Sequence, residues 1–251
     1  MEGYVKTSIQ EGISTIEFFH PQSNSLPGEI LNALADAIRQ AGNDPTALVI
    51  ILRSAGEKTF CAGASFDELV AIKNETEGLK FFSGFAHVIN AMRTCPKFII
   101  GRIQGKCVGG GVGLAASVDY AIAAETAAIK LSELAVGIGP FVVGPAVERK
   151  LDVAAFSQLA IDASSWRGAQ WAKEKGLFAE VHASVEEMDK AIAKLADTLS
   201  HSSPEAMAEM KKTFWRGTDH WDQLLIDRAK ISGRLVLSEF TRNAIVKFKM
   251  K

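Results

Sequence analysis

The stretch "QGKCVGGGVGLAASVDYAIAA", residues 104–124, places glycine at four of the five positions from 109 to 113 and then continues with small residues. Glycine loses more conformational freedom on folding than any other residue, so a run this dense is costly in chain entropy. The run therefore indicates that bare backbone must come close to another group. It also raises the question of why Gly113 has no side chain.

The residues alone allow three interpretations of this run. The first is a nucleotide cradle, because Gly111-x-Gly113-x-x-Ala116 matches the looser dinucleotide-binding fingerprint. That site needs an acidic residue about twenty positions further on, at the end of the next strand. Glu125 lies too near and Glu133 lies past that strand. The second interpretation is close packing of a helix against a strand.

The third interpretation is an oxyanion hole, and it needs a second loop. The segment "FCAGAS", residues 60–65, follows one apolar run, as the glycine run follows another. Both segments precede a predicted helix, where backbone N–H groups lack intrahelical acceptors. Two such groups that converge on one point stabilise a developing oxyanion. Glycine and alanine suit this role because larger side chains would keep a ligand carbonyl away from the backbone.

The pattern of apolar residues alternates strand and helix through the first two thirds of the chain, which favours an α/β fold with largely parallel pairing. Strands are predicted over residues 4–10, 13–19, 47–54, 97–105 and 119–125. Helices are predicted over residues 28–44 and 79–94, and a loop over 55–69. From about residue 185 the pattern is helical and is interrupted at Pro204 and Gly217.

Composition excludes several classes of protein. The 251 residues carry 28 basic and 29 acidic side chains, so bulk charge indicates neither a nucleic-acid partner nor a membrane surface. The N-terminal residues show no signal-peptide pattern, and the longest apolar run is too short to span a bilayer, so we expect a cytoplasmic protein. The three cysteines and five histidines fit no metal-binding spacing, and Cys61 as a nucleophile is a minor alternative.

In combination, "FCAGA" and "IQGKCVGGGVGLAASVDYAIAA" resemble the enoyl-CoA hydratase/isomerase, or crotonase, superfamily. Similar support comes from "HPQSNSLPGEILNAL", "IKLSELAVGIGP" and "WAKEKGLFAEV", so that the resemblance covers roughly residues 4–185. It implies an α/β, crotonase-like spiral of β-β-α units with a C-terminal helical extension. The expected division is a core with an acyl-CoA site in residues 1–195, followed by a helical region, 196–251, for oligomerisation and pocket closure.

The resemblance also implies the partners. The expected substrate is an acyl-CoA thioester, and no separate cofactor is expected because coenzyme A is part of that substrate. No metal is expected. The family assembles as trimers or pairs of trimers, so a homotrimer or hexamer is expected. The motifs do not name the acyl group.

By motif position, the resemblance makes the backbone N–H groups of Ala64 and Gly110 the oxyanion hole and Glu133 the catalytic base. Taken alone, outside this motif, Glu133 favours a surface carboxylate or a helix N-terminal charge after Ser132. Lys58 matches a position that can contact the phosphates of the coenzyme, and Ala62 and Phe141 are further candidate substrate contacts.

Gly113 stands where the hydratases of this superfamily carry their other glutamate. Hydration usually calls for two acid–base groups, whereas moving a double bond needs one carboxylate that takes a proton and returns it elsewhere. The sequence therefore favours an enoyl-CoA isomerase. The alternatives are a hydratase with an unrecognised second group, a catalytically weak acyl-CoA-binding member, and a dinucleotide-dependent oxidoreductase.

Overall fold

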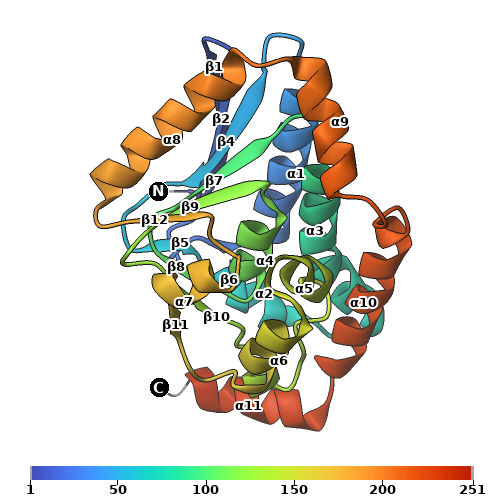
Figure 1. The fold of residues 1–251 in the computed structure, drawn as a ribbon. Helices are drawn as coiled ribbons and strands as arrows, with labels where there is room; N and C mark the ends of the chain where they lie inside the picture. The colour runs from blue at the N-terminus through green and yellow to red at the C-terminus, as the bar shows by residue number, and fades with distance from the viewer. Residues whose placement is uncertain (1, 250–251) are drawn as a thin grey trace.

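The computed structural model describes residues 2–249 and has an α/β fold built around three sheets (Figure 1). A six-stranded sheet has the order β1-β2-β4-β7-β9-β12, a four-stranded sheet the order β11-β10-β8-β5, and β3 pairs with β6. The strands are β1 (Tyr4–Gln10), β2 (Ile13–Phe19), β3 (Ser25–Leu26), β4 (Val49–Ser54), β5 (Thr59–Cys61), β6 (Gly63–Ala64), β7 (Ile99–Ile103), β8 (Lys106–Val108), β9 (Tyr120–Ala124), β10 (Ala128–Lys130), β11 (Arg167–Gly168) and β12 (Glu180–His182).

The helices cover both faces of the large sheet and continue beyond it. They are α1 (Gly28–Asn43), α2 (Phe66–Ala71), α3 (Glu75–Thr94), α4 (Gly110–Ser117), the short 3-10 helix η1 (Leu134–Val136), α5 (Gly144–Leu151), α6 (Val153–Ile161), α7 (Ala169–Glu174), α8 (Val185–Ser200), α9 (Pro204–Phe214), α10 (Trp221–Leu235) and α11 (Glu239–Lys249). Within residues 2–249, none of them is long and apolar enough to cross a bilayer.

The large sheet explains the apolar runs of the sequence. Its first two strands form an antiparallel hairpin around Glu11 and Gly12, and its later strands pair in parallel, as predicted. Ile50 and Leu52 of β4 belong to the main core with α1 and α3, whereas Val49 belongs to a second core under α8. A strand covered on both faces has no polar side, which is why its sequence does not alternate.

The predicted spiral of β-β-α units is confirmed. The units β2-β3-α1 and β7-β8-α4 each add one strand to the large sheet, one to a smaller sheet, and then a helix. The unit that runs from β4 to α3 follows the same pattern and also contains β6 and α2. Strands β2, β4, β7 and β9 begin at residues 13, 49, 99 and 120, so successive turns differ in length. The sequence therefore shows no fixed repeat although the backbone repeats a pattern.

The segment at residues 55–69, predicted as a loop, is more ordered than expected. It contains β5, β6 and the start of α2, and the Ser65 hydroxyl caps α2 by accepting from the Glu68 N–H at 3.4 Å. Helix α3 begins at Glu75, four residues before its predicted start, because the Asn74 side chain caps it. Short strands and caps of this kind leave little periodicity in a sequence.

The C-terminal helices begin with α8, which places Met188, Ile192 and Ala196 in one buried stripe against the large sheet. The predicted division after residue 195 therefore falls inside one continuous helix. Further on, α10 crosses α3 so closely that a Cβ atom on Gly78 would lie 2.7 Å from the Cα of Gly233. This contact sets the position of α10 beside the central part of the fold (Figure 1).

Candidate active site

One cavity of about 1120 Å³ brings together segments from the whole chain. Five of the six predicted site residues line it, namely Ala62, Ala64, Gly110, Glu133 and Phe141. The sixth, Lys58, is exposed and is not among the residues that line the cavity. The tertiary fold therefore gathers the two glycine-bearing loops and the candidate base into one place.

The first loop is held by a buried asparagine in the turn before β3. The Asn24 side chain donates to the backbone oxygens of Ala55, at 2.8 Å, and Thr59, at 3.0 Å. In the same loop, Gly63 has a φ of +92°, which an L side chain rarely adopts. A Cβ atom at Gly63 would lie 3.0 Å from the Val108 carbonyl oxygen and 3.5 Å from the backbone nitrogen of Gly110. The first loop thus packs directly against the second.

The second loop turns sharply into α4. Gly109 has φ and ψ values of 52° and −115° and stands at the N-cap, where no side chain caps the helix. Gly110 is the first residue of α4, so its N–H belongs to the group of donors that have no intrahelical acceptor. The start of α4 therefore offers backbone donors at the wall of the cavity.

Three glycines of the run are required by the space around them. A Cβ atom would lie 2.2 Å from the Phe85 ring if added at Gly110, and 2.2 Å from the Cys61 carbonyl oxygen if added at Gly111. At Gly113 it would lie 2.4 Å from Cγ1 of Val143. Protein atoms already fill the space beside these three glycines. A nucleotide phosphate would need that space, so the nucleotide-cradle interpretation is not favoured. Close packing, the second interpretation, explains Gly111 and Gly113.

Glu133 stands at the start of η1, where its carbonyl oxygen accepts hydrogen bonds from the N–H groups of Val136 and Ile138. Its carboxylate faces the second loop, because a Cβ atom on Gly109 would lie 3.1 Å from Oε1 of Glu133. The residue as a whole is partly exposed, but its Oε2 atom is buried and has no hydrogen-bond partner among residues 2–249.

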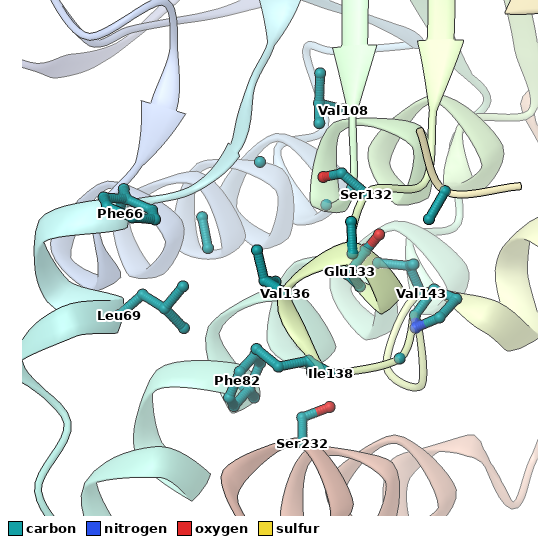
Figure 2. A pocket seen from close by; sticks show the side chains of 18 of the residues that line it. Phe66, Leu69, Phe82, Val108, Ser132, Glu133, Val136, Ile138, Val143 and Ser232 are labelled. Carbon is teal, nitrogen blue, oxygen red and sulfur yellow. The ribbon is translucent and has the colours of Figure 1, made fainter. Parts of the chain in front are cut away.

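Burial raises the pKa of Glu133 from 4.5 to about 7, and a hydrogen bond from its own backbone N–H opposes this shift. The cause is desolvation, since a carboxylate in apolar surroundings loses the water that stabilises its charge. Figure 2 shows the carboxylate directed into the cavity beside Val136 and Val143. A buried carboxyl with a pKa near neutrality can both accept and donate a proton.

The remaining wall of the cavity is largely apolar. It includes three phenylalanines near the start of α3, namely Phe81, Phe82 and Phe85. Phe85 is also part of the main core. The ring of Phe141 packs on Gly139, where a Cβ atom would lie 2.5 Å from it. Such walls exclude water and strengthen electrostatic interactions inside the site.

Polar residues that sequence analysis missed also line the cavity. Lys130 and Ser132 come shortly before the candidate base in the chain, Ser232 comes from α10, and Asn243 and Lys247 come from α11. No local signal could have found the last three, since they lie about 100 residues from Glu133 within ordinary amphipathic patterns. Helices α10 and α11 therefore supply part of the cavity lining.

Cys61 and Asp119 are not among the residues that line the cavity. Burial raises the pKa of the Cys61 thiol to about 12, so it is a neutral side chain rather than a nucleophile. The Asp119 side chain is only 7% exposed, and its Oδ2 atom lies 2.8 Å from Nζ of Lys211. Across residues 2–249, no group of three or more His, Cys, Asp or Glu side chains could hold a metal ion.

Known proteins support the fold and the family. A family model described as enoyl-CoA hydratase/isomerase matches residues 8–242. The structure is similar to the crystal structure of an enoyl-CoA hydratase from Bacillus halodurans, with a TM-score of 0.90, 21% identity, and coverage of 97% of this chain and 99% of that one.

Two curated relatives carry different activities. A carnitinyl-CoA dehydratase of Proteus mirabilis is 28% identical over 195 residues, which are 77% of this chain and 73% of that protein. A (7aS)-7a-methyl-1,5-dioxo-2,3,5,6,7,7a-hexahydro-1H-indene-carboxyl-CoA hydrolase of Rhodococcus jostii is 32% identical over 132 residues, and the match spans only 51% of its length. With the family model matched over nearly its whole length, this chain belongs to the enoyl-CoA hydratase/isomerase family of acyl-CoA-processing enzymes.

Proposed function

We propose that this protein is an enoyl-CoA isomerase that moves a carbon–carbon double bond by means of one carboxylate. The observation that carries this proposal is the state of Glu133. Its Oε2 atom is buried without a partner, in the same cavity as the two glycine-bearing loops. No second carboxylate stands at position 113, because Val143 occupies the space that a side chain there would need.

In the proposed reaction, Glu133 takes a proton from the carbon next to the thioester of a 3-enoyl-CoA. The electron pair of that C–H bond forms a dienolate, whose negative charge develops on the thioester oxygen. The N–H groups of Ala64 and Gly110 bind that oxygen, and each donor of this kind is worth about 3–4 kcal/mol of barrier. Glu133 then returns the proton two carbons further along, so the product is a 2-enoyl-CoA of unchanged mass.

A second candidate is hydration, and the dehydratase relative favours it. In that reaction Glu133 either activates the water or protonates the acyl carbon, and a second group performs the other step. This second group is not the side chain of residue 113. The cavity is large enough to admit water beside an acyl chain. The two candidates differ in their products, because hydration adds one water and isomerisation adds nothing.

The deciding experiment offers the purified protein a 3-enoyl-CoA and a 2-enoyl-CoA in separate reactions, followed by mass spectrometry and chromatography. We expect the 3-enoyl-CoA to give the 2-isomer at unchanged mass, and no gain of mass from the 2-enoyl-CoA. A gain equal to one water in either reaction would overturn isomerisation and support the hydratase. Binding without any conversion, across several acyl lengths, would support a catalytically weak member.

We also propose that Lys58 contacts the phosphates of the coenzyme from outside the cavity.

We further propose that the protein forms a homotrimer or hexamer. Exposed apolar side chains on two of the later helices support association. Val153 and Ile161 of α6 are 65% and 75% exposed, and Phe240 of α11 is 67% exposed. Sedimentation velocity tests this assembly, and a single monomeric species at micromolar concentration would contradict it.

A further inference from the structure

Ser232 is a buried hydroxyl that the proposed chemistry does not use. The residue lies on α10, is only 1% exposed, and lines the same cavity as Glu133. Its Oγ atom makes no hydrogen bond in the part of the chain that the structure describes, and it is not among the fully buried unpaired oxygens, so the hydroxyl reaches the surface of the cavity. A hydroxyl at the wall of a ligand pocket can hydrogen-bond a group that enters it.

Other buried helical serines of this protein behave differently. The Ser83 hydroxyl donates to the Leu79 carbonyl oxygen at 2.7 Å, and the Ser117 hydroxyl donates to the Gly113 carbonyl oxygen at the same distance. Bonding back by four residues is the usual way for a helical serine to satisfy itself. Ser232 does not do this, and Figure 2 shows its hydroxyl directed into the cavity.

The position of this hydroxyl is fixed by the packing of its neighbour. Gly233 touches the backbone of Gly78, where a Cβ atom would lie 2.7 Å from Gly233 Cα, so α10 cannot slide or rotate freely against α3. Most of the side chains that Figure 2 labels around the cavity are apolar, Phe82 and Ile138 among them. A rigid polar atom in a largely apolar wall is the pattern of a specificity contact in a ligand pocket.

We propose that Ser232 hydrogen-bonds a neutral oxygen, a hydroxyl or keto group, on a part of the acyl chain remote from the thioester. This inference rests on the proposed acyl-CoA site and names its substrate class as oxygenated acyl-CoA thioesters. A single hydroxyl can pair with a neutral oxygen by one hydrogen bond, whereas a charged substituent also needs an ion-pair partner, which Ser232 does not supply. A plain hydrocarbon chain leaves the hydroxyl unpaired and is bound less well.

The test uses a series of medium-chain acyl-CoAs that carry one hydroxyl at successive carbons, with the unsubstituted acyl-CoA as reference. Calorimetry with the saturated series measures binding to the intact protein, and kcat/KM is measured with the unsaturated series. We expect one hydroxyl position to bind more tightly than the reference. Ser232→Ala is expected to lower affinity and kcat/KM for that compound by about tenfold and to leave the reference unchanged.

Ser83→Ala is the matched control, since it removes a buried helical hydroxyl that bonds to its own helix. It should not change the preference between the two compounds, and thermal unfolding checks that both variants fold. The inference is overturned if no hydroxylated compound binds better than the reference, or if Ser232→Ala weakens both equally. If the saturated hydroxylated compound binds more tightly than the reference, the Ser232 contact is supported even when no turnover is seen. If none of the unsaturated compounds reacts, that result counts only against the proposed isomerase activity.

Discussion

Two buried acidic side chains of this protein have opposite surroundings. Asp119, before β9, has a side chain only 7% exposed, with Oδ2 at 2.8 Å from Nζ of Lys211. Its oxygens also accept from the backbone N–H of Ile99, at 2.8 Å, and from Nε1 of Trp215, at 3.0 Å. Glu133 has a buried Oε2 atom and no partner for it among residues 2–249.

The difference shows that burial alone does not give a carboxylate its role. Asp119 ties α9 to the large sheet, because Lys211 also donates to the Lys97 carbonyl oxygen at 2.7 Å. Three donors hold its two oxygens in place, so Asp119 stabilises the fold. The desolvated Glu133 is costly to ionise and is therefore ready to exchange a proton.

The different roles of the two acids are tested most directly by neutralising each acid in turn. Glu133→Gln should reduce kcat for double-bond migration by about 10⁴-fold, because it removes the only proposed proton carrier. Acyl-CoA affinity by calorimetry and the unfolding midpoint should stay close to wild type. Turnover within tenfold of wild type would show that another group carries the proton.

Asp119→Asn should have the reverse effect. It leaves the Lys211 ammonium, which is 2% exposed, without its counter-charge, and should lower the free energy of unfolding by about 3–5 kcal/mol. Urea unfolding measures this loss, and kcat of the folded enzyme should not change. Asp227→Asn, which breaks an exposed pair with Lys230, is the control and should leave the midpoint unchanged. A loss of kcat as large as that of Glu133→Gln would contradict the structural role.

Substitution of Gly113 tests whether Val143 packs tightly against it in the wall of the cavity. Gly113→Ala places a Cβ atom 2.4 Å from Cγ1 of Val143 and should lower the free energy of unfolding by about 1–3 kcal/mol. Adding Val143→Ala should recover part of that loss, since the two sites are in contact. Gly168→Ala, with nothing within 4 Å of its Cβ atom, is the control and should be close to neutral. Purely additive losses in urea would contradict the packing explanation.

The smallest expected effect is on pH dependence. Because the pKa of Glu133 is about 7, kcat/KM should rise by roughly tenfold between about pH 6 and about pH 8 as the carboxylate forms. The folded-state pKa lies above the ordinary value of 4.5, so the stability contribution of Glu133 is complete below that value and is lost as pH rises through about 7. Glu133→Gln should lack this loss, and a flat rate profile would contradict the assignment.

Sequence analysis predicted the elements that have a strong period or a strong motif. The N-terminal hairpin, the buried strand β4 and helix α1 follow their patterns closely, and the order of the two glycine-bearing loops and Glu133 was readable from motifs. It missed Asp119, whose partner Lys211 lies 92 positions away, because no local pattern links an aspartate to a lysine on a later helix. It also missed Ser232, because no local pattern shows that a serine on α10 lines the same cavity as Glu133.

By itself, then, the sequence determined that the chain alternates strands and helices, that bare backbone is needed at residues 109–113, and which family the motifs resemble. Only the tertiary structure decided that Val143 fills the space beside Gly113, that the Glu133 carboxylate is desolvated, and that α10 and α11 complete the cavity. The physical reason is that propensity and spacing act between neighbours in the chain. Burial and charge pairing depend on residues that meet only after folding.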